Sequence, residues 1–153
     1  MSRYFPLFVN LAGRRVVVYG AGSIGSRRIR SLLEFGCSLT VVAPEASGEV
    51  KKLSEESKLL WEQAEYQPGR IPEDACLVLA ATNSREVNAR IGAECKRKQI
   101  PVNVSSDKSL CDFYFPGLAI KEDLVAGVTA GGGDHKKAGR AAEEIRRVFK
   151  KKL

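Results

Sequence analysis

Six residues near the start of the chain have the types and the spacing that suit the binding of a diphosphate. Residues 20–25 read GAGSIG, and they directly follow Arg14–Tyr19, an apolar run that predicts a buried strand. At these positions Gly20 permits a tight turn, Gly22 lets a diphosphate approach the backbone, and Gly25 lets the next helix pack closely. Because the first amides of a helix are unpaired, they would point at the anion. The loop therefore predicts a dinucleotide-binding site.

An acidic side chain at the end of the second strand usually accompanies such a loop, where it holds a ribose hydroxyl. The second strand is predicted at Ser38–Ala43 and stops at Pro44, so Glu45 stands one or two positions late. Arg27 and Arg28 lie in the first helix, and no clamp for a 2′-phosphate is evident after the second strand. These positions mildly favour NAD over NADP.

Polar residues also follow the later strands. In an open parallel sheet, ligands bind at the carboxyl ends of the strands, where the strand order reverses. The candidates for this part of the site are Thr82, Asn83, Asn103, Ser106 and Asp107. Capping is the alternative role for one of them, because either Asn83 or Ser84 can cap the helix that follows. The two roles do not exclude each other.

The elements that position these groups alternate between strands and helices up to residue 104. Strands are predicted at Arg14–Tyr19, Ser38–Ala43, Leu59–Tyr66, Cys76–Ala81 and Ile100–Val104. Helices are predicted at Ser26–Phe35, Glu49–Ser57 and Ser84–Lys98. This alternation is typical of an α/β fold of the Rossmann type, with a doubly wound parallel sheet.

The pattern changes in the last third of the chain. Two strands, Phe113–Ile120 and Leu124–Thr129, flank a polar turn and predict a β-hairpin. A Gly-rich loop at residues 130–134 follows, and then an amphipathic helix from about Lys136. We therefore divide the chain into a dinucleotide-binding domain at residues 1–110 and a smaller region at residues 111–153.

Composition excludes several classes of protein. No apolar run in the 153 residues approaches the ~20 residues that span a bilayer, and the start of the chain lacks the apolar centre of a secretory signal. The four cysteines do not have the spacing of a metal site. We expect a cytoplasmic protein with no membrane segment and no resident metal.

Positive charge is concentrated at the end of the chain. The net charge is +7, and eight of the 25 Lys and Arg residues fall within residues 136–152. A surface of this kind attracts polyanions. A nucleic acid is the weaker candidate, because no aromatic platform and no known binding motif accompanies the charge.

Several segments match the pattern of one family in its order and spacing. They are Phe5-Pro6-Leu7-Phe8, residues 16–22 (VVVYGAG), residues 39–44 (LTVVAP), residues 80–83 (AATN) with Val87-Asn88, and Asn103-Val104 followed by residues 110–113 (LCDF). On these motifs, which lie within about residues 4–133, the chain resembles precorrin-2 dehydrogenase, the amino-terminal module of siroheme synthase.

The resemblance implies NAD-dependent oxidation of precorrin-2 to sirohydrochlorin by a homodimer, in which the region after the dinucleotide-binding domain forms the dimer contact. By position, it implies NAD contacts at Ser23, Ile24, Pro44 and Glu45, and near Thr82. Many members also insert ferrous iron.

The anionic tetrapyrrole has the charge that suits the basic end of the chain. Its candidate contacts are Asn103 and, in the Gly-rich loop, Gly131, Gly132 and His135.

This sequence departs from the family at a position that matters for catalysis. The family usually has Asn-Val-Val-Asp where residues 103–106 read NVSS, so the aspartate aligns with Ser106. A serine cannot act unaided as a general base at neutral pH, but the neighbouring Asp107 can replace the aspartate if the loop shifts by one residue. Ser106 and Asp107 are therefore the candidate catalytic residues.

Two further departures argue against iron insertion, which needs a base for the pyrrole protons and a complete cavity. Residues 131–137 read GGGDHKK where the family usually continues with Ser-Pro, and the region after residue 133 is shorter than in most members. A non-catalytic module that binds NAD(H) or a tetrapyrrole, as a sensor or carrier, is the alternative to an enzyme.

Overall fold

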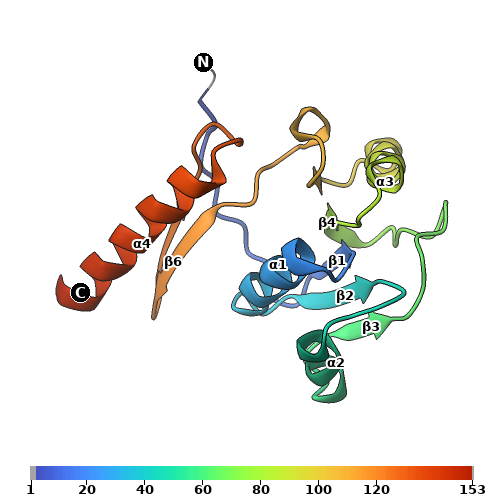
Figure 1. Ribbon diagram of the computed structural model, residues 1–153, viewed down its shortest axis with the longest axis horizontal. Helices are drawn as coiled ribbons and strands as arrows, with labels where there is room; N and C mark the ends of the chain where they lie inside the picture. Colours follow the sequence, from blue (N-terminus) through green and yellow to red (C-terminus); the bar gives the residue numbers. More distant parts are fainter. Residues whose placement is uncertain (1–2, 153) are drawn as a thin grey trace. The chain divides into compact units, whose positions relative to one another are not determined.

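The computed structural model describes residues 3–152, and the chain forms two compact units (Figure 1). The larger one, called here the sheet unit, is Asn10–Phe113. The smaller one, called the hairpin unit, joins the residues before Asn10 to those from Tyr114 onward.

A parallel sheet of five strands forms the centre of the sheet unit. Its strands are β1 (Arg15–Tyr19), β2 (Ser38–Val42), β3 (Leu60–Glu62), β4 (Ala75–Ala80) and β5 (Val102–Val104), in the order β3-β2-β1-β4-β5. Tyr19 pairs with Val42 and with Ala80, and Ala80 pairs with Val104, so these four strands end level with one another. We call this border of the sheet the carboxyl edge.

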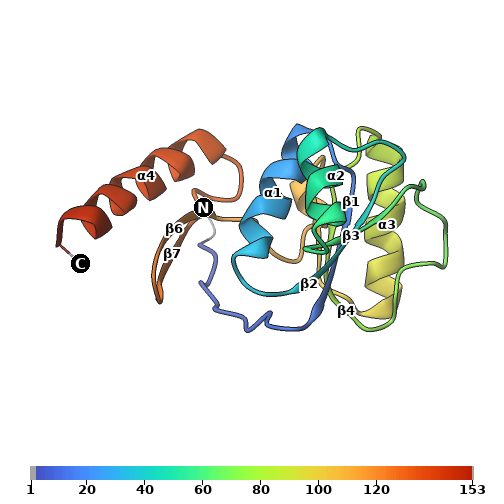
Figure 2. The same ribbon diagram turned by 90° about the horizontal axis from the view of Figure 1, so that it is seen from below.

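Helices cover both faces of the sheet. In Figure 2, α1 (Ser23–Leu33) and α2 (Gly48–Glu55) lie on one face, and α3 (Arg85–Lys98) lies on the other. These helices form because apolar side chains recur at helical spacing and are buried against the sheet, as Ile29 of α1 and Ile91 of α3 are. The predicted α/β fold with a doubly wound parallel sheet is confirmed.

The third predicted strand, Leu59–Tyr66, is too long. β3 ends at Glu62, and no helix follows before β4. The chain leaves the sheet because Tyr66 packs edge-on against Tyr19, with ring centroids 5.6 Å apart, and Ile71 is buried in the core next to α3. Residues 63–74 therefore form an irregular connection across the α3 face of the sheet.

Glu94 of α3 holds this connection from a buried position, with 1% of its surface exposed. Its carboxylate accepts hydrogen bonds from the Tyr66 hydroxyl and, at 3.3 Å, from the Ile71 N–H, and Lys98 Nζ lies 3.2 Å away. Burial by itself raises the pKa of a carboxyl group, but hydrogen bonds from Tyr66, from the Gly69 backbone and from Lys98 outweigh it, so the pKa of Glu94 is lowered. Burial and the bond to Glu94 raise the pKa of Tyr66 to about 12.

The hairpin unit consists of two antiparallel strands and one helix. Its elements are β6 (Gly117–Lys121), β7 (Leu124–Val128) and α4 (His135–Lys152). Small residues allow close packing, because a Cβ on Gly117 would lie 3.0 Å from the Ala138 carbonyl oxygen of α4. The predicted hairpin and helix are confirmed, although β6 begins later than the predicted strand at Phe113. Among residues 3–152, no helix combines the length and the apolar character needed to cross a bilayer.

Candidate functional site

The glycine loop fills the turn between β1 and α1, and two of its glycines are required by close backbone contacts. Gly20 has a φ of +102°, and a Cβ there would lie 2.2 Å from the Ala81 carbonyl oxygen at the end of β4. A Cβ on Gly25 would lie 2.4 Å from the Gly20 carbonyl oxygen. Any larger side chain would push β4 or α1 away from the turn, so glycine is needed at positions 20 and 25 for this geometry.

The start of α1 is open to a ligand. Gly22 is its N-cap residue and provides no side-chain cap to the helix amides. No other atom lies within 4 Å of the place where a Cβ on Gly22 would stand. Unpaired amides at a helix start favour an anion, and the space beside Gly22 admits one. The residues present therefore fit the diphosphate of a dinucleotide.

The turn after β2 is held by side chains from β3 and just beyond it. Trp61 Nε1 donates to the Ala43 carbonyl oxygen at 3.0 Å, and Gln63 Nε2 donates to the Pro44 carbonyl oxygen at 3.3 Å. Pro44 and Glu45 are exposed at the carboxyl edge. The predicted ribose-side residues thus stand on a turn whose backbone is fixed. The sequence did not indicate Trp61, because the residue types in a strand do not show which side chain will donate a hydrogen bond to a neighbouring strand or turn.

A hydrogen-bond network joins the end of β4 to the turn after β5. The buried Asn88 of α3 accepts from the Thr82 N–H at 3.0 Å and from the Thr82 hydroxyl at 2.7 Å. Its Nδ2 donates to the Thr82 carbonyl oxygen at 3.1 Å and to Ser106 Oγ at 3.2 Å. The structure therefore brings together two of the predicted site residues, Thr82 and Ser106, through a third residue that the strand ends did not indicate.

Of the two residues that could cap α3, Ser84 is the cap and Asn83 is not. Ser84 is the N-cap of α3, and its Oγ accepts from the Val87 N–H at 3.2 Å. Asn83 is exposed at the carboxyl edge.

Asn103 of β5 is buried, with 3% of its surface exposed, and both ends of its amide are engaged within the chain. Its Oδ1 accepts from Arg28 Nη1 of α1, and its Nδ2 donates to the Phe113 carbonyl oxygen at 2.9 Å. Burial lowers the pKa of the Arg28 guanidinium. Asn103 thereby ties the dinucleotide-loop helix to the segment that leaves the sheet unit.

Asp107 lies in the turn after β5, where it caps the short 3₁₀ helix Lys108–Leu110. Its Oδ1 accepts from the Ser109 N–H at 3.0 Å and from the Ser109 hydroxyl at 2.6 Å. These bonds, and the nearby charge of Arg85, lower the pKa of Asp107. The residue is therefore a carboxylate at neutral pH.

The remaining predicted site residues belong to the hairpin unit. Gly131 and Gly132 have positive φ values of 64° and 73°, and a Cβ on Gly132 would lie 2.7 Å from the Tyr114 ring. His135 is the exposed first residue of α4. Within residues 3–152, no three His, Cys, Asp or Glu side chains are grouped so that they could hold a metal ion.

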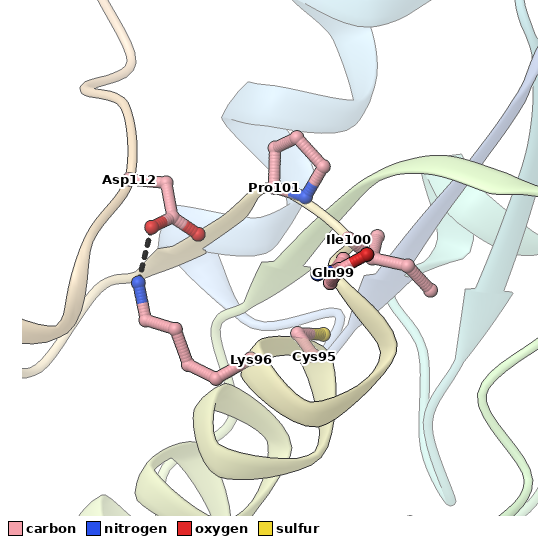
Figure 3. Close-up of a pocket in the computed structure, with 6 residues that line it drawn as sticks. All are labelled: Cys95, Lys96, Gln99, Ile100, Pro101 and Asp112. Atoms are coloured by element: carbon pink, nitrogen blue, oxygen red, sulfur yellow. Dashed lines mark hydrogen bonds and ion pairs between the residues drawn. The ribbon is translucent and has the colours of Figure 1, made fainter.

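A surface hollow lies away from the carboxyl edge. Figure 3 shows its lining, which comes from the end of α3, the residues just before β5 and a Lys96–Asp112 ion pair. Burial raises the pKa of its Cys95 thiol to about 12, so that thiol is unreactive at neutral pH. None of the predicted site residues lines this hollow.

Comparisons with known proteins agree with this geometry. The model of a family described as "Putative NAD(P)-binding" (NAD_binding_7) matches residues 7–117. The chain is 34% identical over 145 residues to the "Probable multifunctional siroheme biosynthesis protein HemA" of Ruminiclostridium josui, covering 94% of this chain and 28% of that protein. It is also 34% identical over 150 residues to the siroheme synthase of Neisseria meningitidis serogroup C (strain 053442), covering 98% and 29%.

A solved structure extends the likeness to the whole fold. The chain superposes on "SirC, precorrin-2 dehydrogenase" with a TM-score of 0.74 and 25% identity, covering 94% of this chain and 70% of that one. By contrast, the chain spans less than a third of the length of the two curated relatives above.

Proposed function

This chain belongs to the NAD(P)-binding family whose model it matches, and from that premise we propose that it oxidises precorrin-2 to sirohydrochlorin with NAD⁺ in siroheme biosynthesis. The observation that carries the proposal is the superposition on SirC over 94% of the chain, together with the sequence likeness to siroheme synthase. The non-catalytic alternative, a sensor or carrier, lacks a specific observation in its favour.

The dinucleotide would be held along the carboxyl edge. The amides of Gly22, Ser23, Ile24 and Gly25 would hold its diphosphate, and Gly20 keeps the turn close to the sheet. Pro44 and Glu45 would hold the ribose, and Thr82 and Asn83 would hold the nicotinamide. When bound, NAD⁺ supplies the hydride acceptor.

The substrate carries carboxylates around its ring, and the chain offers complementary charge. Arg85 and Lys108 lie beside Asp107 at the carboxyl edge, and α4 of the hairpin unit is rich in Lys and Arg. We assign Asn103 to the substrate region as a positioning residue, because its amide is engaged by Arg28 and Phe113 within the sheet unit. In the hairpin unit, we assign Gly131, Gly132 and His135 to substrate contacts. Hydride transfer to NAD⁺ depends on how the substrate and the cofactor are positioned more than on a nucleophilic side chain.

Conversion of precorrin-2 to sirohydrochlorin removes a hydride and a proton, so the proton needs an acceptor. Asp107 is the carboxylate at the turn after β5, and Ser106 beside it offers a hydroxyl. We assign the proton to Asp107 and a substrate hydrogen bond to Ser106.

The test is an anaerobic assay with purified protein, precorrin-2 and NAD⁺. We expect the absorbance of sirohydrochlorin to appear together with that of NADH in equal amounts. We expect added Fe²⁺ to yield no siroheme above the rate without protein. Folded protein that binds NAD⁺ and produces no sirohydrochlorin would reject the proposal.

Replacing Asp107 with asparagine separates its charge from its structural role. The amide oxygen can still accept the Ser109 N–H, so we expect the unfolding midpoint and the NAD⁺ affinity to stay unchanged. Loss of a general base costs about 100-fold or more in rate, and we expect kcat to fall by that amount in steady-state assays. Asp74→Asn, at an exposed aspartate paired with Arg15, is the control. Full activity of Asp107→Asn would assign the proton to water instead.

A homodimer and a cytoplasmic location belong to the same proposal. Leu118 and Ile120 of β6 lie on the face of the hairpin opposite to the buried Ala119, and Ile120 is 37% exposed. An apolar hairpin face of this kind suits a second copy of the chain. Sedimentation equilibrium measures the mass; a monomer at micromolar concentration would contradict the dimer.

The cysteines of residues 3–152 are free thiols, as suits a reducing compartment.

A further inference from the structure

Asn88 stands behind the carboxyl edge rather than on it, with 1% of its surface exposed. We propose that Asn88 is a positioning residue of this site, which fixes the end of β4 for the dinucleotide and turns the Ser106 hydroxyl hydrogen toward the tetrapyrrole. The inference rests on the proposed function and adds a residue to it.

The amide of Asn88 has all of its hydrogen-bonding capacity in use. Its oxygen accepts two hydrogen bonds from Thr82, and its nitrogen donates one to Thr82 and one to Ser106. An amide has two donor hydrogens and two acceptor lone pairs, so no capacity is left over. A flipped amide would set Nδ2 against the Thr82 N–H and Oδ1 against the Thr82 carbonyl oxygen. The side chain therefore has a single acceptable orientation.

The two halves of this amide serve two sides of the site. The oxygen and one hydrogen hold Thr82, the residue that follows β4 next to the glycine turn. The other hydrogen reaches Ser106, which follows β5. Strands that are adjacent in the sheet thus have their ends joined by one buried side chain from α3. This arrangement keeps the cofactor side and the substrate side at a fixed separation, as hydride transfer requires.

The bond to Ser106 also determines what Ser106 can do. Because Asn88 Nδ2 donates to Ser106 Oγ at 3.2 Å, the serine oxygen is an acceptor in this pair and its own hydrogen points elsewhere. Within the described part of the chain, no acceptor for that hydrogen lies in bonding range, and Ser106 is partly exposed. The hydroxyl is therefore a donor available to an anionic ligand such as a tetrapyrrole carboxylate.

Two substitutions of Asn88 separate these halves. Asn88→Asp keeps the oxygen that accepts from Thr82, but it loses the hydrogen bond donated to the Thr82 carbonyl oxygen and gives the Ser106 hydroxyl an acceptor that turns its hydrogen away from the ligand. We expect the dissociation constant for NAD⁺ to rise by less than fivefold and that for sirohydrochlorin to rise at least tenfold, both measured by fluorescence titration. Asn88→Leu removes both halves, and we expect both dissociation constants to rise at least fivefold.

A double-variant cycle tests the route through Ser106. We expect Ser106→Ala to weaken sirohydrochlorin binding as Asn88→Asp does, and the double variant to be no weaker than either single one. Asn10→Asp adds the same charge at an exposed position, where its oxygen can still accept the Ala12 N–H, and is the control.

The outcomes separate this inference from the proposed function. If Asn88→Asp weakens both ligands in parallel with a lower unfolding midpoint, or if the double variant is additive, Asn88 is only structural and the inference is overturned. If the wild-type protein binds both ligands but does not oxidise precorrin-2, the proposed function fails, and the split between the two affinities still decides the role of Asn88.

Discussion

Glu94→Gln is expected to lower the free energy of unfolding by about 3–5 kcal/mol, the usual cost of removing one partner from a buried ion pair. The carboxylate is buried and receives donors from Tyr66, Ile71 and Lys98. A glutamine amide would set its own donor hydrogens against one or more of them. Urea unfolding monitored by the fluorescence of Trp61 measures the change. Because a domain of this size is stabilised by only about 5–15 kcal/mol, the variant stands near the limit of folding.

Two further variants keep this prediction testable if Glu94→Gln fails to fold. Tyr66→Phe removes a single hydrogen bond to the charged group, and we expect it to cost about 1.5–3 kcal/mol. Glu73→Gln is the matched control, because Glu73 also pairs with Lys98 but has 81% of its side chain exposed. We expect that control to change stability by less than about 0.5 kcal/mol. Equal effects at Glu73 and Glu94 would show that burial of the carboxylate is not what matters.

The contribution of Glu94 depends on pH in a defined direction. Its pKa in the folded protein is lowered below the ordinary value, so its ionisation stabilises the fold above the pKa of the unfolded chain, about 4.3. The contribution is lost as the pH falls through the lowered value. We therefore expect the difference in stability between wild type and Glu94→Gln to be constant near neutral pH and to shrink under acidic conditions.

Gly22→Ala is expected to weaken NAD⁺ binding more than tenfold without changing the unfolding midpoint. The φ of Gly22 is −78°, which alanine adopts readily, and the new methyl group meets no atom within 4 Å in the protein alone. That same methyl group occupies the space through which a diphosphate reaches the amides of α1. Each lost hydrogen bond to a charged group costs about 1.5–3 kcal/mol, or roughly 10- to 150-fold in affinity.

A matched glycine provides the control for this variant. Gly48 also begins a helix, α2, and a Cβ there also meets nothing within 4 Å. Isothermal titration with NAD⁺ compares the two variants. We expect Gly48→Ala to bind as the wild type does. Unchanged NAD⁺ affinity in Gly22→Ala would place the diphosphate somewhere other than the start of α1.

Periodicity and turn residues in the sequence were sufficient to predict the sheet and its helices. Strand β1, the glycine loop and α1 follow one another as expected, because each is determined by neighbouring residues. The extent of β3 could not be predicted in this way. Tyr66 has a strand-forming side chain, but it contacts Tyr19, Glu94 and Arg90 instead of continuing the strand. Those contacts join residues that are distant in the sequence.

In the candidate site, too, contacts between residues distant in the sequence could not be predicted. Residues that follow strands, such as Thr82 and Ser106, could be listed from the parallel topology alone. Their partners could not, because Asn88 lies in the first turns of α3 and Arg28 meets Asn103 across 75 residues of sequence. A buried asparagine looks the same in a sequence as an exposed one. Only the arrangement of α1 and α3 around the sheet identifies which polar side chains face inward.

The hairpin unit is built from the two extremes of the described chain, and this has a consequence for how the protein is made. Tyr4 packs against Tyr114, with ring centroids 4.5 Å apart and a hydrogen bond of 3.0 Å between their hydroxyls. Tyr4 leaves the ribosome early, and its partner is synthesised only after the whole of Asn10–Phe113. The dinucleotide-binding sheet can therefore complete its folding during translation, whereas the hairpin unit can form only after Tyr114 and the residues that follow it have been made. Until then Tyr4 has no partner ring, and the neighbouring segment Phe5–Phe8 is exposed both before and after the hairpin unit forms.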